Sequence, residues 1–162
     1  MEDAVIAQQR QRNVDAMLSA LPVSLGFRRC WRGQDPFELR SENCVIRFLF
    51  ERCESSSCII QILHPLDTKP PMHSLLLQYL RSVKMPESNS ATWFADYGRM
   101  LATYFGDVLS GDFSIRSQYA AVEKRFWDRL FDIERLPVDH PTRILCDNYD
   151  LRWLDEIERD RE

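Results

Sequence analysis

Long apolar runs are missing from this chain of 162 residues. No stretch of about 18 uninterrupted apolar residues occurs, so the sequence excludes a membrane-spanning helix. The first residues, MEDAVIAQQRQRN, are acidic and then polar. They lack the basic region and apolar core of a secretory signal. We therefore expect a cytoplasmic protein without a membrane partner.

Glycine-rich loops and nucleophile motifs are also missing. The five glycines are scattered, so no phosphate-binding loop is predicted. The three histidines, His64, His73 and His140, do not stand in a recognisable pattern with a serine or cysteine. We therefore predict that the chain is not an enzyme and needs no cofactor. Because a catalytic triad is defined by geometry and not by spacing, a site assembled from His64, His140 and a carboxylate stays as an alternative.

Cysteines are few and odd in number. The absence of an export signal and an odd count of five argue against a disulfide framework. Cys53 and Cys58 are the closest pair, but no second pair or nearby histidine completes four zinc ligands. We predict no metal site, and we expect Cys30, Cys44 and Cys58 to be small apolar residues that fill space on strands.

The residues that are present are typical of one globular domain over residues 1–162, with 44% apolar and 28% charged side chains. A helix is predicted over residues 3–20. Period-two alternation of β-branched and aromatic residues over 25–63 predicts an antiparallel meander of three to four strands. Helical spacing follows over 73–84, from Ser90 as N-cap to about Leu109, from about 114 up to Pro137, and over 150–160. The predicted fold is therefore α+β, with a helix and sheet over residues 1–67 and a helical C-terminal half over 72–160 packed on the sheet.

Negative charge is concentrated at the C-terminus. Residues 1–143 hold 18 acidic and 18 basic residues, whereas residues 144–162 hold seven acidic residues and three arginines. This segment disfavours nucleic acid and favours a basic protein partner. Trp153 is either an exposed anchor for that partner or a buried anchor of the last helix. The candidate partner-binding residues are Asp147, Tyr149, Asp150, Trp153, Asp155, Glu156 and Glu158.

Two other segments also carry clustered charge. Arg28, Arg29 and Arg32 surround Trp31, an arrangement that can stack on single-stranded nucleic acid. The acidic balance of the whole chain, −4 at neutral pH, argues against such a partner, and we predict none. Further along, Asp128 and Asp132 alternate with arginines, which predicts exposed ion pairs along a helix.

In its size, acidic balance and α+β layout, most of the chain resembles immunity proteins of bacterial polymorphic toxin systems. The resemblance implies a monomer or weak dimer that binds and neutralises a basic toxin domain through the acidic C-terminal segment. Residues 1–67, with VDAMLSALPVSLGF running into FELRSENCVIRF, also resemble type III secretion chaperones. That alternative implies a dimer whose strands return after the second helix, whereas residues 72–137 are predicted to be helical.

Overall fold

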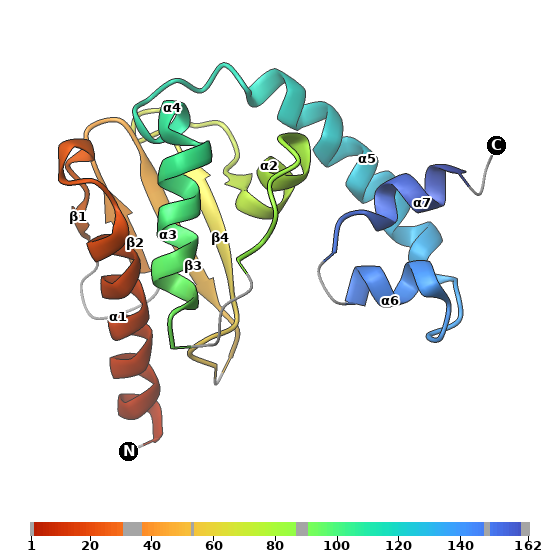
Figure 1. The fold of residues 1–162 in the computed structure, drawn as a ribbon, viewed down its shortest axis with the longest axis horizontal. Coiled ribbons are helices and arrows are strands. Elements are labelled where there is room, and N and C mark those ends of the chain that lie inside the picture. Colours follow the sequence, from red (N-terminus) through yellow and green to blue (C-terminus); the bar gives the residue numbers. More distant parts are fainter. Residues whose placement is uncertain (1, 31–36, 53, 87–90, 148–149, 160–162) are drawn as a thin grey trace. The chain divides into compact units, whose positions relative to one another are not determined.

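The computed structural model describes residues 2–30, 37–52, 54–86, 91–147 and 150–159 (Figure 1). It contains an N-terminal helix, a five-stranded antiparallel sheet and further helices, which confirms the predicted α+β class. The chain divides into two compact units. We call residues 1–74 and 84–114 the sheet unit, and residues 75–83 and 115–162 the helical unit. The single domain expected over residues 1–162 stays a prediction.

The sheet is a meander in which each strand pairs with the next along the chain. Its strands are β1 (Arg28–Arg29), β2 (Phe37–Arg40), β3 (Val45–Phe50), β4 (Cys58–Leu63) and β5 (Met72–His73). The predicted strand from residue 25 is wrong at its start, because a 3₁₀ helix, η1 (Val23–Leu25), comes first and ends at Gly26 with φ +72°. The strand β5 was not predicted, since two residues are too few to show alternation.

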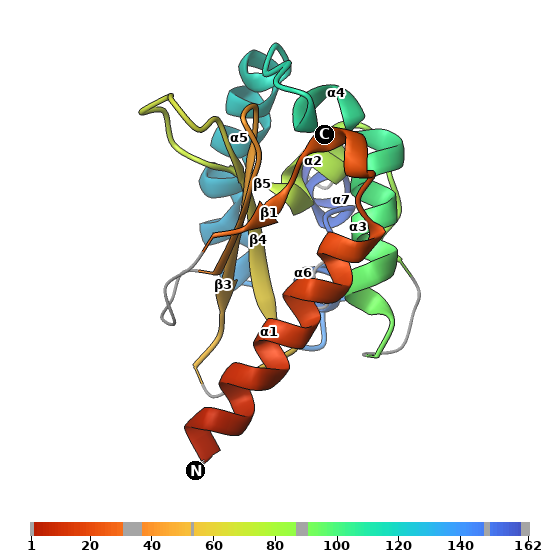
Figure 2. The ribbon, with the colours of Figure 1, turned by 90° about the vertical axis from the view of Figure 1, so that its left-hand side faces the viewer.

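One face of the sheet is covered by helices of the sheet unit. In Figure 2, α1 (Glu2–Ala20) and α3 (Trp93–Tyr104) lie on the same side of the strands. The strand residues that alternate toward one face, such as Phe48 and Ile60, are buried, whereas Leu49 and Ile59 are 38% and 46% exposed. The alternation expected from the sequence is therefore confirmed.

The helix expected to run to about Leu109 is broken. It ends at Tyr104, and a short helix, α4 (Gly106–Leu109), follows after Phe105, whose φ of −128° is not helical. The break buries Phe105 and leaves Tyr104 55% exposed, although both residues fall within the helical spacing of apolar residues in this segment. Gly111 ends the region with φ +103°, a conformation that favours glycine. The proposed N-cap, Ser90, lies outside the described residues.

The cysteines differ in their surroundings. Cys44 is buried and Cys58 is half-buried, as space-filling residues would be. Desolvation raises the pKa of each thiol to about 12. Cys30 is exposed, so its expected role as a buried filler is wrong. It follows the two-residue edge strand β1, where there is little sheet to bury it. Cys53 lies outside the described residues.

The helical unit is formed by α5 (Arg116–Glu134), α6 (Pro141–Asp147), α7 (Trp153–Arg159) and most of α2 (Ser74–Leu80). From Arg116 to Arg159, the described residues contain no strand. The helix α6 lies between Pro137 and residue 150, where the sequence predicted no helix. There, His140 Nδ1 accepts a hydrogen bond from the Thr142 amide at 3.2 Å. None of the described helices is both long enough and apolar enough to cross a membrane.

Candidate partner-binding surface

The last helix, α7, is held to the helical unit by buried apolar side chains. Trp153, Leu154 and Ile157 are at most 7% exposed and form a core cluster with Ile133 of α5. The Trp153 ring also packs against Phe126, with 5.7 Å between the ring centroids. The structure therefore favours the second interpretation of Trp153, as an anchor of the helix. Its side chain offers a partner no exposed surface.

Three of the candidate carboxylates form ion pairs with arginines close to them in sequence. Asp147 lies 3.4 Å from Arg143 on α6. Asp150, before α7, accepts hydrogen bonds from Arg152, and Glu156 pairs with Arg159 one turn later. The hydrogen bonds from Arg152 lower the pKa of Asp150. At neutral pH its carboxylate is therefore charged and locally compensated.

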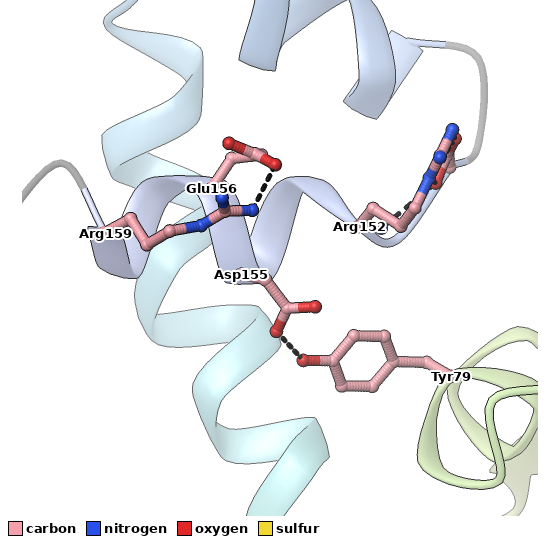
Figure 3. Close-up of polar contacts among 6 residues, drawn as sticks. Tyr79, Arg152, Asp155, Glu156 and Arg159 are labelled. Atoms are coloured by element: carbon pink, nitrogen blue, oxygen red, sulfur yellow. Dashed lines mark hydrogen bonds and ion pairs between the residues drawn. The ribbon is translucent and has the colours of Figure 1, made fainter.

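The other two candidate carboxylates bind groups that are distant in sequence. The hydroxyl of Tyr79, on α2, donates a hydrogen bond to Asp155 at 2.5 Å. Glu158 accepts one from Nε of Arg129, on α5, at 2.8 Å. Figure 3 shows that Asp155 and Glu156 leave α7 on opposite sides, one toward Tyr79 and the other toward Arg159. These two adjacent carboxylates of α7 therefore point in different directions.

The helical unit as a whole is nearly balanced in charge. Residues 75–83 and 115–162 contain 12 acidic and 10 basic residues, a net charge of −2. The arginines that compensate the C-terminal acids include Arg129 and Arg143, which precede the segment counted in the sequence. Tyr149 lies outside the described residues, as do Trp31 and Arg32 of the basic N-terminal segment.

An exposed aromatic pair on α5 was missed by the sequence reasoning. Trp127 is 53% exposed and Phe131 is 70% exposed. Their exposure could have been predicted, because the two residues are four apart and fall outside the inward-facing helical spacing of Phe126, Leu130 and Ile133. The ion pairs expected beside them are confirmed. They are Lys124 with Asp128 at 3.4 Å and Arg129 with Asp132 at 3.7 Å.

His64 and His140 each bind the local backbone. Nδ1 of His64 accepts a hydrogen bond from the Leu66 amide at 3.1 Å, and His140 does the same for Thr142. The His64 ring also lies against Phe113, with 5.2 Å between ring centroids. Across the described ranges, no group of three or more His, Cys, Asp or Glu side chains is placed to hold a metal ion.

Replacement of Tyr79 by phenylalanine tests the link between α2 and α7. Burial raises the pKa of the Tyr79 phenol, and the hydrogen bond with Asp155 raises it further, so the hydroxyl is protonated at neutral pH and can donate. Removing the hydroxyl should lower the free energy of unfolding by about 1 kcal/mol. Asp155→Asn keeps an acceptor and should cost less. Equal losses in the two variants, measured by denaturant unfolding, would contradict this assignment.

The helical unit thus presents carboxylates paired with arginines on and around α7, and an exposed aromatic pair on α5. Each of these features can contribute to the binding of another macromolecule. Comparison of the chain with models of protein families, with curated proteins and with solved structures found no match.

Proposed function

We propose that the chain is a binding protein that neutralises a cognate toxin by occluding it through the acidic C-terminal surface, as an immunity protein does. The observation that carries this proposal is the combination of accessible carboxylates with a firmly anchored backbone. Asp155 and Glu156 of α7 are exposed and half-exposed, and three apolar side chains of the same helix are buried. Asp147, at the end of α6, is also exposed. A rigid element that presents charge loses little conformational entropy on binding.

The intramolecular arginines do not block this function. Arg152 and Arg159 are 75% and 67% exposed, and an exposed ion pair contributes only about 0–1 kcal/mol. A lysine or arginine of the partner can therefore replace them at little cost. In a desolvated interface, charge-assisted hydrogen bonds to the same carboxylates are stronger than in water. The compensating arginines would also select against partners that lack a basic surface.

Charge reversal on α7 tests the proposal. The variant Asp155→Lys with Glu156→Lys should raise the Kd for a cognate basic toxin domain on the order of 100-fold at low salt, and should flatten the dependence of Kd on salt. The measurement is isothermal titration calorimetry at several salt concentrations.

A matched control changes the net charge by the same amount elsewhere. Glu42 and Glu54 are exposed residues of the sheet unit. Their replacement by lysine should leave the Kd within about twofold, apart from a small general electrostatic effect. If the α7 variant binds with the affinity and salt dependence of the control, the acidic surface is not the binding site.

A further inference from the structure

The helix α5 carries a second stripe on the side away from its buried residues. The stripe consists of residues that share one helical face because they are spaced four, three, four and three apart. Its central members, Trp127 and Phe131, are apolar, and Lys124 is 81% exposed. The stripe residues are Ala120, Lys124, Trp127, Phe131 and Glu134, all exposed. Two large rings side by side on a surface are typical of an interaction site, whereas single exposed apolar residues are common.

The stripe is complementary to its own reversed copy, because its charges exchange sign when the helix is read in the opposite direction. Counted from the level of Arg129, Trp127 and Phe131 lie two residues to either side, and Lys124 and Glu134 lie five residues to either side. The order is therefore positive, aromatic, aromatic, negative. When a second copy of the stripe is laid against the first in the opposite direction, each positive charge meets a negative charge and each ring meets a ring.

A second pair of opposite charges, at the rim of the stripe, is also equally spaced about Arg129. Glu123 and Arg135 lie six residues to either side of the same level. Among the described residues, the side chains of Glu134 and Arg135 have no intramolecular ion pair, and Lys124 is paired only with its neighbour Asp128 at 3.4 Å. Glu123 accepts a hydrogen bond from the Tyr119 hydroxyl.

We propose that this stripe binds a second copy of the chain, with the two α5 helices antiparallel about a two-fold axis. In such a pair Trp127 of each copy meets Phe131 of the other, and Lys124 meets Glu134. Each contact occurs twice because a two-fold interface is isologous. Offset or edge-to-face aromatic pairs supply the desolvated centre, and the opposite charges at the rim fix the direction and register.

The self-association does not depend on the proposed function. The Trp127 ring lies edge-on against Phe126, with 5.1 Å between the ring centroids, and Phe126 in turn contacts Trp153 of α7. The carboxylates of Asp155 and Glu156 bind Tyr79 and Arg159, which are not stripe residues, so the proposed α5 pairing uses different side chains from the proposed toxin contact. A dimer would carry two acidic surfaces, one on each copy.

Sedimentation equilibrium of the full chain is the first test. The wild-type chain should form a dimer with a Kd of about 1–100 μM, as expected for a small interface. The variant Trp127→Ala with Phe131→Ala should weaken the dimer on the order of 100-fold or more, because each ring is lost twice. Val23→Ala, at a residue that is 96% exposed on η1, is the control and should not change the Kd.

Charge exchange tests the antiparallel register. Lys124→Glu and Glu134→Lys should each raise the Kd about tenfold, because each places two pairs of like charges in contact. A mixture of the two single variants should form a heterodimer of nearly wild-type strength, since both contacts then join Glu with Lys. The double variant should also recover. A wild-type chain that stays monomeric to millimolar concentration, or a mixture that shows no recovery, would overturn the proposal.

Discussion

Replacement of Trp153 by alanine is expected to lower the free energy of unfolding by about 3–5 kcal/mol, the usual cost of removing a large buried ring. Trp153 is 1% exposed and is the largest fully buried side chain among those described. It lies at the centre of the small core that joins α7 to α5. The substitution would leave a cavity, and a unit with so few buried residues has little other buried apolar surface to compensate for the lost stability.

Denaturant unfolding followed by circular dichroism measures this effect. Trp127→Ala removes the same ring from an exposed position and should cost less than about 1 kcal/mol at concentrations where the chain is monomeric. The shape of the wild-type curve also tests the single-domain prediction, because one cooperative domain unfolds in one transition. A Trp153→Ala variant as stable as Trp127→Ala would show that α7 is not held by this ring.

Replacement of Gly98 by valine should cost about 3 kcal/mol, since overpacking at a close helix contact forces the backbones apart. A Cβ atom at Gly98 would lie 3.0 Å from the carbonyl oxygen of Met17 and 3.2 Å from Cβ of Ala20. Met17 is itself fully buried, and both contacts belong to α1. The glycine therefore sets how closely α3 approaches α1 over the sheet.

Gly106 provides the matched control. It is also a glycine on a helix of the sheet unit, but a Cβ atom there would meet nothing within 4 Å. Gly106→Ala should leave the unfolding midpoint unchanged or raise it slightly, because alanine loses less backbone entropy. Thermal unfolding of both variants measures the difference. If Gly98→Val unfolds at the wild-type temperature, the close contact between α1 and α3 does not limit their packing.

Elements with several alternating or helically spaced residues could be predicted from the sequence. The strand β4 ends at Leu63, the last residue of the alternation predicted over 25–63, because a run of β-branched residues gives a clear period of two. The strand β5 could not be found, since a two-residue strand forms only where β4 supplies its hydrogen-bonding partner. The break at Phe105 was missed for a similar reason. Apolar residues keep helical spacing across it, and only tertiary packing shows that the helix bends there.

The candidate surface was predictable in composition but not in arrangement. The sequence located the C-terminal acids, and the structure gives each described one an intramolecular partner. Some of those partners are remote, as with Arg129 and Glu158, which are 29 residues apart, and Tyr79 and Asp155, which are 76 apart. Such pairs depend on how helices cross, which local spacing does not encode. Trp153 could not be assigned from sequence because an aromatic residue among acids fits either a surface or a core.

The helical unit is assembled from two separate stretches of chain, with residues 84–114 returning to the sheet unit between them. No single cut can therefore release either unit whole. A fragment that starts at Ile115 would contain α5, α6 and α7 but would leave the Asp155 carboxylate without the phenol of Tyr79. During synthesis, residues 75–83 emerge from the ribosome well before α5, α6 and α7, so this unit can be completed only after α7 has emerged.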